Sequence, residues 1–355
     1  MVAVAVDSIR HWTSEVLLAT GLAPDDARIV ADSLVFADLR GVTTHGVLRL
    51  PTYVARIRAG GIDPAGRTRV VADLGALVVV DSANGPGAAT AMRATSIVIE
   101  RAREHGIGCV IARNANHFGA SAYFTNQIAD AGMLGIAACN TEPVMCAPFG
   151  GAPVLGTNPI ALAVPLPRTN RPQLDMATTT TSQGRLIIAA RDGEDIPLGW
   201  AVDRRGRPTT LPQEGLEGAL LPMGGPKGFG LAFAVDALLA LAGANVSTGV
   251  AALHGDDSAP QRLGHLLIAI RADAAGTLED YQGSIRGLAV AVHASGTGLD
   301  VPAPLVPGEP EVNRERDSGG LIDVSSHVRD DLAELARSSG VRLPTELTST
   351  DTNER

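Results

Sequence analysis

The stretch LVVVDSANGPG, residues 77–87, decides which fold class the chain belongs to. Leu77–Val80 is a short apolar run rich in β-branched residues, which is typical of a buried strand. The turn Asn84–Gly87 ends it, an alanine-rich segment to about Glu104 has the composition of a helix, and Cys109–Ile111 resembles the next strand. This strand–helix–strand unit predicts a mixed α/β chain.

The glycines of this turn do not complete a dinucleotide-binding fingerprint. A Rossmann turn needs a third glycine, where this chain has Thr90. It also needs an acidic residue after the second strand to hold a ribose, where Arg113 and Asn114 stand instead. We therefore expect a fold that is not Rossmann.

Helical patterns flank a strand-rich middle. Apolar residues recur at helical spacing near both ends of the chain. Between them we predict an apolar helix over Leu231–Gly243 and strands at Leu134–Ala138, Ile160–Val164, Leu174–Met176, Leu186–Ala189, His265–Ile270 and Gly287–Val292. We interpret the proline-rich stretch Val301–Pro310 as a linker. The expected organisation is a helical domain of residues 1–75 completed by 305–345, a strand-rich domain of residues 76–304, and a loose tail at 346–355.

Composition narrows the class of function. The chain has 355 residues and a net charge of −9, which argues against nucleic-acid binding. Three cysteines without CxxC spacing indicate a reducing compartment, and the histidines show no HxxxH spacing, so no metal is expected. The sequence shows neither a signal peptide nor a long apolar run, so we expect a cytoplasmic protein that does not act at membranes.

Lys227 is the single lysine beside 28 arginines, which together make the 29 basic residues. It lies in the glycine cluster Gly224–Gly230. Glycine lets backbone approach a ligand closely, and a compact ammonium suits such a site better than a planar guanidinium. The pattern predicts a ligand contact by Lys227, with a chance surface lysine as the alternative.

Thr44 and His45 begin a first constellation with Arg49 and Tyr53. If the stretch is helical, His45, Arg49 and Tyr53 share a face, although Pro51 makes the start of that helix uncertain. A histidine can exchange a proton near neutral pH, and an arginine can grip both oxygens of a carboxylate. The pair suits a 2-oxo or 2-hydroxy acid, whereas an incidental surface histidine and arginine is the alternative.

Two further groups have the same ambiguity. His117 follows an apolar strand, where α/β proteins place ligand-binding residues, but it could equally be a structural histidine. Asp175 stands between apolar residues and could orient a histidine or cap local amides. A hydrolase built on Thr44, His45 and Asp175 is a rival, but adjacent residues should point their side chains apart, which disfavours it.

Taken in order, these segments resemble the type-2 malate/L-lactate dehydrogenases. This family includes malate, L-lactate, sulfolactate and ureidoglycolate dehydrogenases, and diketogulonate and piperideine-2-carboxylate reductases. The resemblance extends from about residue 8 to 340, and the matching segments are Arg40–Tyr53, Asn114–Gly119, Gly156–Ile160, Leu174–Thr178, Gly224–Gly230 and Pro307–Glu309.

The resemblance implies a homodimeric enzyme that uses NAD or NADP on a fold that is not Rossmann, with 76–304 as the cofactor-binding domain. It implies hydride transfer between nicotinamide and C2 of a small 2-hydroxy or 2-oxo acid, or of a cyclic imine carboxylate. His45 would exchange the proton, oriented by Thr44 and Asp175, with His117 as its rival. Substrate-binding residues would be Arg49, Tyr53 and Thr157. Cofactor-binding residues would be His117, Asp175, Met176, Ala177, Lys227, Gly228, Pro307, Gly308 and Glu309.

Overall fold

The structure is a computed structural model that describes residues 1–296 and 303–348. Its helices are α1 (Val6–Ala19), α2 (Pro24–Leu39), α3 (Leu50–Ala59), α4 (Gly87–His105), α5 (Ser121–Asp130), α6 (Gln183–Asp192), α7 (Pro212–Glu217), α8 (Pro226–Ala240), α9 (Leu278–Ala294), α10 (Glu309–Asp317), α11 (Ser326–Ser339) and α12 (Thr345–Thr348). Its strands are β1 (Val2–Ala5), β2 (Arg69–Asp73), β3 (Leu77–Asp81), β4 (Ile107–Ala115), β5 (Met133–Cys139), β6 (Met145–Cys146), β7 (Pro153–Leu155), β8 (Ile160–Ala163), β9 (Gln173–Met176), β10 (Ala201–Val202), β11 (Pro208–Thr209), β12 (Ala219–Leu220), β13 (Leu263–Arg271) and β14 (Leu321–Val324).

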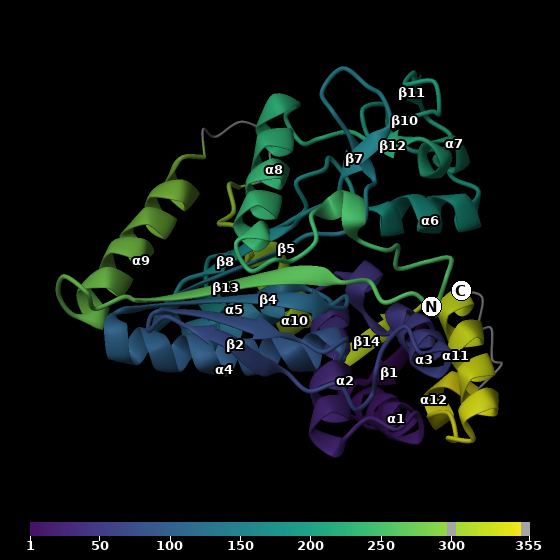
Figure 1. The fold of residues 1–355 in the computed structure, drawn as a ribbon, viewed down its shortest axis with the longest axis horizontal. Coiled ribbons are helices and arrows are strands. Elements are labelled where there is room, and N and C mark those ends of the chain that lie inside the picture. Colours follow the sequence, from purple (N-terminus) through teal and green to yellow (C-terminus); the bar gives the residue numbers. More distant parts are fainter. Residues whose placement is uncertain (297–302, 349–355) are drawn as a thin grey trace.

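A seven-stranded sheet forms the centre of the molecule (Figure 1), with the strand order β2-β3-β4-β13-β5-β8-β9. Strands β3 and β4 are parallel and are joined by α4, as the strand–helix–strand pattern predicted. The other neighbouring pairs in this sheet are antiparallel. A doubly wound Rossmann sheet is mostly parallel, so this topology confirms a mixed α/β fold of another kind.

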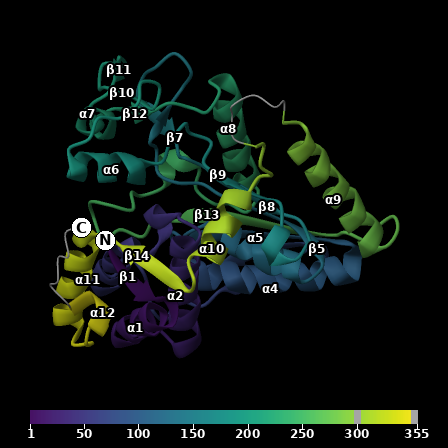
Figure 2. The ribbon, with the colours of Figure 1, turned by 180° about the vertical axis from the view of Figure 1, so that it is seen from behind.

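Helices cover both faces of this sheet. Helices α4 and α5 lie on one face and α8 on the other (Figures 1 and 2). Gly108 of β4 permits the close approach of α4, because a Cβ there would lie 2.3 Å from the carbonyl oxygen of Val98. The packed sheet brings the loop that follows β4, which carries His117, to the edge where the site forms.

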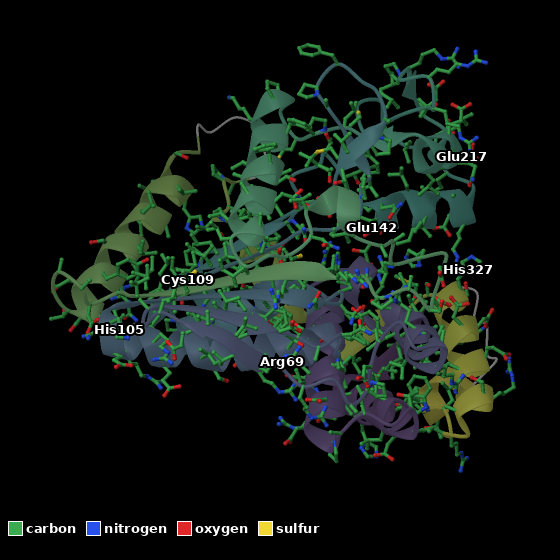
Figure 3. All side chains as sticks on the ribbon, viewed as in Figure 1. Arg69, His105, Cys109, Glu142, Glu217 and His327 are labelled. Atoms are coloured by element: carbon green, nitrogen blue, oxygen red, sulfur yellow. The ribbon has the colours of Figure 1, made fainter. Side chains whose placement is uncertain are left out.

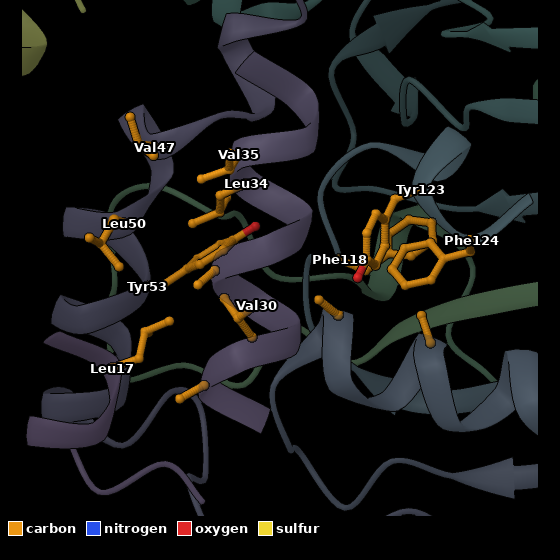
Figure 4. Close-up of a cluster of buried hydrophobic side chains, with 14 of the residues drawn as sticks. Leu17, Val30, Leu34, Val35, Val47, Leu50, Tyr53, Phe118, Tyr123 and Phe124 are labelled. Carbon is orange, nitrogen blue, oxygen red and sulfur yellow. The ribbon is translucent and has the colours of Figure 1, made fainter. Parts of the chain in front are cut away.

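The two ends of the chain meet in a second layer. Strand β1 pairs antiparallel with β14, and α1, α2 and α12 contact this two-stranded sheet, while α11 packs against α1 and α3. Tyr53 is buried there among apolar side chains, which Figure 4 shows: Leu17, Val30, Leu34, Val35, Val47 and Leu50. Each buried aliphatic side chain contributes about 1.5–3 kcal/mol. Strand β2, before the expected boundary at residue 75, pairs with β3 in the central sheet.

A smaller five-stranded sheet, in the order β11-β10-β12-β6-β7, carries α6 and α7. Here the prediction of a strand at Leu186–Ala189 is wrong, because these residues lie in α6. The run Leu-Ile-Ile-Ala is β-branched and short, and such runs do not distinguish strand from buried helix. The helix is decided by the Ser182 cap and by Leu186, which is buried against Ile196 and Leu220.

The predicted strand at Gly287–Val292 is also wrong, because it lies in α9. A capping box starts this helix, in which Thr277 and Asp280 exchange side-chain and backbone hydrogen bonds. The predicted linker is shorter than expected: Glu309 already begins α10, with Pro310 in its first turn, and residues 301 and 302 lie outside the described residues. Of the predicted tail, residues 349–355 also lie outside, and α12 occupies Thr345–Thr348.

Candidate active site

A cavity of about 410 Å³ lies between the segment 36–49, the loop after β4, strand β9 with the loop that follows it, and the first turn of α6. Most of the site residues predicted from the sequence line this cavity. The predicted site residues that line it are Thr44, His45, Arg49, His117, Thr157, Asp175, Met176, Ala177 and Gly308.

The remaining predicted residues lie elsewhere. Tyr53 is buried behind His117, with its hydroxyl 2.6 Å from the Nδ1 atom of that ring. Lys227 is exposed on the first turn of α8, near Met223, which lines the cavity. Gly228 is packed so closely that a Cβ would lie 2.4 Å from the Met223 carbonyl oxygen. Pro307 and Glu309 line a second cavity of about 390 Å³.

The segment that carries His45 and Arg49 is not one helix. Two 3₁₀ turns, Thr43–His45 and Val47–Arg49, precede α3, so the predicted shared helical face holds only from Leu50 onward. Asp38 fixes these turns by accepting a hydrogen bond of 2.8 Å from the Val47 amide. Burial raises the pKa of Asp38 to about 7, against the opposing effect of that amide. Gly46 leaves room for the carboxylate, because a Cβ there would lie 1.8 Å from Oδ1 of Asp38.

Arg49 is a buried cation without an acidic partner in the part of the chain that the structure describes. Its Nε donates to the Thr44 carbonyl at 2.7 Å, and its Nη1 lies 2.7 Å from Nε2 of His254. Burial lowers the pKa of the guanidinium from its ordinary value. A buried charge is costly unless it is paired, so this arrangement favours an anionic ligand at Arg49.

His45 and His117 stack beside that arginine, with ring centroids 5.5 Å apart and an angle of 22° between planes. Thr44 Oγ1 lies 3.0 Å from Nδ1 of His45, so the expectation that these neighbouring side chains diverge is wrong. The tight 3₁₀ turn, with fewer residues per turn than an α-helix, lets them meet.

Both imidazoles are neutral at ordinary pH in the free protein. Burial, and then the charge of Arg49, lowers the pKa of His45 to about 3. Burial also lowers the pKa of His117 well below its ordinary value, and repulsion from His45 in its protonated form and from Arg49 adds to the effect. A neutral imidazole can accept a proton from a hydroxyl group.

Asp175 faces the cavity from β9 with an exposed side chain. Its Oδ2 accepts a hydrogen bond of 2.8 Å from the amide of Ala122 in the first turn of α5. Within residues 1–296 and 303–348, no hydrogen bond joins it to a histidine. Although this side chain is open to the cavity, the protein around it reduces its hydration, and this desolvation raises the pKa of Asp175 to about 6 against the opposing effect of the Ala122 amide. The structure therefore places this carboxylate on a backbone amide, at the cavity surface.

Among the cavity residues that sequence reasoning missed, His254 and Glu142 matter most for Arg49. Glu142 lies in the middle of the molecule (Figure 3), and its Oε1 accepts from the amide of Leu253 at 3.3 Å. His254 stands in a polar loop whose residues follow neither a helical nor a strand pattern. The sequence contains no signal for this contact with Arg49, because tertiary packing alone creates it.

Within the described ranges, no group of three or more His, Cys, Asp or Glu side chains is placed to hold a metal ion. Among the same residues, no helix combines the length and the apolarity needed to span a bilayer. The three cysteines are free thiols.

Comparison with known proteins identifies relatives along nearly the whole chain. The family model described as malate/L-lactate dehydrogenase matches residues 4–333. An L-sulfolactate dehydrogenase from Methanocaldococcus jannaschii is 36% identical over 334 residues, covering 93% of this chain and 95% of the relative. A ureidoglycolate dehydrogenase (NAD(+)) from Escherichia coli K12 is 36% identical over 268 residues, covering 74% and 75%. A (2R)-3-sulfolactate dehydrogenase (NADP(+)) from Chromohalobacter salexigens is 31% identical over 322 residues, covering 90% and 94%.

Solved structures show the same likeness. The sulfolactate dehydrogenase of M. jannaschii superposes with a TM-score of 0.87 at 35% identity, covering 96% of this chain and 98% of that one. The delta1-piperideine-2-carboxylate reductase of Pseudomonas syringae pv. tomato gives a TM-score of 0.84 at 29% identity, covering 95% and 100%. The chain therefore shares its fold with solved structures of a dehydrogenase and a reductase.

Proposed function

Because the chain belongs to the malate/L-lactate dehydrogenase family, we propose that it transfers hydride between NAD or NADP and C2 of a small 2-hydroxy or 2-oxo acid. His45 exchanges the proton and Arg49 binds the carboxylate. The relatives carry either NAD(+) or NADP(+) in their names. The chain itself is an oxidoreductase of the CH–OH type.

One observation carries this proposal: Arg49 is a buried cation with no acidic partner among the residues that the structure describes, in the wall of a cavity that also holds two neutral imidazoles. A guanidinium is suited to a carboxylate, because it offers parallel N–H donors in one plane. With Nε donating to Thr44 and one N–H of Nη1 donating to His254, both N–H groups of Nη2 and the second N–H of Nη1 are left for the substrate. A carboxylate held there places its C2 atom near the histidines.

The proton is assigned to His45. Neutral His45 accepts the hydroxyl proton when a 2-hydroxy acid is oxidised, and returns it to the C2 oxygen when a 2-oxo acid is reduced. The substrate carboxylate offsets the charge of Arg49, which is one of the two causes that lower the pKa of His45 in the free protein. Substrate binding therefore raises the proton affinity of His45 at the moment when the proton is needed.

The cavity also has groups that fit a nicotinamide cofactor. Asp175 offers an exposed carboxylate and Thr157 a hydroxyl, while Met176 and Ala177 complete an apolar wall beside them. Such a mixture of a few polar groups on an apolar surface is typical of cofactor sites. Asp175, Met176, Ala177 and Gly308 would hold the cofactor, with Lys227, Gly228, Pro307 and Glu309 as further candidates. The cofactor supplies hydride chemistry when it is bound.

A panel of acids assayed with NADH and with NADPH tests the function. We expect loss of nicotinamide absorbance with at least one 2-oxo acid among oxaloacetate, pyruvate and sulfopyruvate. A flat trace with every acid and both cofactors would count against the proposal. The structural similarity of this chain to a piperideine-2-carboxylate reductase supports a second candidate substrate, a cyclic imine carboxylate, which belongs in the same panel.

The hydrolase alternative loses support because, among the described residues, Asp175 is hydrogen-bonded to the Ala122 amide and not to a histidine.

We further infer that the enzyme is a homodimer. Large apolar side chains are exposed on two helices: Phe233 at 63% and Leu238 at 44% on α8, and Leu288 at 62% and Val290 at 66% on α9. Exposed apolar patches of this kind mark interaction surfaces in soluble proteins. Light scattering in solution should give twice the 36.5 kDa chain mass, and Phe233→Asp together with Leu288→Asp should shift it to the monomer. A monomeric wild-type protein would contradict this.

A further inference from the structure

We propose that His254 is a positioning residue that holds the guanidinium of Arg49 in place for the substrate carboxylate. The inference rests on the function proposed above. It begins from one contact, the 2.7 Å hydrogen bond between Nη1 of Arg49 and Nε2 of His254, which joins segments 205 residues apart. Both side chains line the cavity, and His254 is exposed to it.

Arg56 fastens the loop that delivers His254. Arg49 immediately precedes α3, and Arg56 lies in that helix seven residues further along the chain. The guanidinium of Arg56 is fully buried and donates to backbone carbonyls of the loop, at 3.3 Å to Leu253 and 3.2 Å to Asp256, and also to Ala259. Because Arg56 binds backbone, it fixes the loop without depending on the loop side chains.

Two further contacts limit the position of the loop that carries His254. Gly61, just beyond α3, has no Cβ, and one placed there would lie 2.1 Å from the carbonyl oxygen of Asp257. Glu142 accepts a hydrogen bond from the amide of Leu253. The loop is thus hydrogen-bonded at residues 253, 256 and 259 and passes close to Gly61 at residue 257, so a supported backbone presents His254 to Arg49.

The imidazole has a chemical advantage over an acid at this position. Arg49 donates, so Nε2 must carry the lone pair and the ring is neutral. Burial and the charge of Arg49 lower the pKa of His254 to about 4, which keeps the ring neutral at ordinary pH. A carboxylate at residue 254 would neutralise Arg49 and compete with the substrate, whereas neutral His254 orients the guanidinium and leaves its charge available.

Four variants of one residue test the role. His254→Gln keeps an acceptor at the same number of bonds from Cα as Nε2, His254→Asn is one bond shorter, His254→Ala has none, and His254→Glu adds a charge. The readouts are the KM and kcat for the 2-oxo acid, the KM for the reduced cofactor, and the Kd of oxalate by calorimetry. Oxalate is an anion that needs Arg49 but no hydride transfer. His11→Ala, on exposed α1, is the matched control.

We expect His254→Ala and His254→Asn to raise the KM of the acid and the Kd of oxalate roughly ten- to hundredfold, as loss of a hydrogen bond to a charged group predicts. His254→Gln should restore both to within a few-fold of wild type, and His254→Glu should weaken binding most. The cofactor KM, the melting temperature and the His11→Ala control should not change.

Two results overturn the role of His254: oxalate and acid constants that are the same in wild type and His254→Ala, or a His254→Gln variant as weak as His254→Ala. Failure of the proposed function looks different. In that case the wild type oxidises neither cofactor with any acid, while oxalate binding and its dependence on residue 254 are still measured.

Discussion

Replacing Arg49 by methionine is expected to lower kcat/KM for the 2-oxo acid by roughly 10²- to 10³-fold, about 3–4 kcal/mol, while the protein stays folded. The loss follows from removing the only cation we assign to the substrate carboxylate. Folding should survive because Arg49 has no acidic partner among the described residues, so no opposite charge is left buried and unpaired. An apolar side chain of similar length can fill the same space.

Arg49→Lys separates charge from geometry. A lysine keeps the positive charge but loses the planar fork, so we expect an intermediate loss of activity. Arg171→Met is the matched control, because Arg171 is also buried but pairs with Asp130 at 2.6 Å and with Asn126. It should lower the melting temperature and leave the KM of the acid nearly unchanged. If Arg49→Met had the kcat/KM of the wild type, the assignment of Arg49 to the substrate carboxylate would be wrong.

The second large effect is expected at His45. His45→Gln should lower kcat in both directions by roughly 10²- to 10⁴-fold, the usual range for loss of a general acid or base. The KM of the acid should change little, because Arg49 still binds the carboxylate. Rapid-mixing measurement of nicotinamide absorbance under single-turnover conditions would show that hydride transfer itself is slowed.

His117→Gln provides the comparison, since both rings line the cavity and stack on each other. His117 is already bonded to Tyr53 through Nδ1, so we assign it to substrate orientation and expect a smaller loss. In the wild type, reduction needs protonated His45 and should slow as the pH rises through its pKa in the substrate complex. This decrease in the rate of reduction with rising pH should be absent in His45→Gln. If it vanishes in His117→Gln instead, the proton belongs to His117.

The elements that the sequence predicted well are those with one clear local pattern. The strand at Leu77–Val80, the alanine-rich helix after Gly87 and the strand at His265–Ile270 form where predicted. Leu186–Ala189 and Gly287–Val292 were predicted as strands because short apolar runs fit both periods. Their helical state depends on capping by Ser182 and Thr277 and on packing.

Several residues of the candidate site could be predicted from the sequence, but their arrangement could not. The motifs around His45, Arg49, His117 and Asp175 are visible in the sequence, because each side chain has a distinct chemistry and follows a strand or a turn. Their convergence on one cavity is not visible there. The sequence also misled at Thr44 and His45, whose side chains meet because the backbone turns as 3₁₀ and not as α-helix.

By itself, the sequence determined the mixed α/β class, the failure of the Rossmann fingerprint and the family, since these depend on local patterns and residue identity. Only the tertiary structure decided that Asp175 rests on an amide of α5, that Arg49 lacks an acidic partner among the described residues, and that His254 reaches Arg49 across 205 residues of chain. The physical reason is that burial and charge pairing are properties of a packed environment, which distant segments create together.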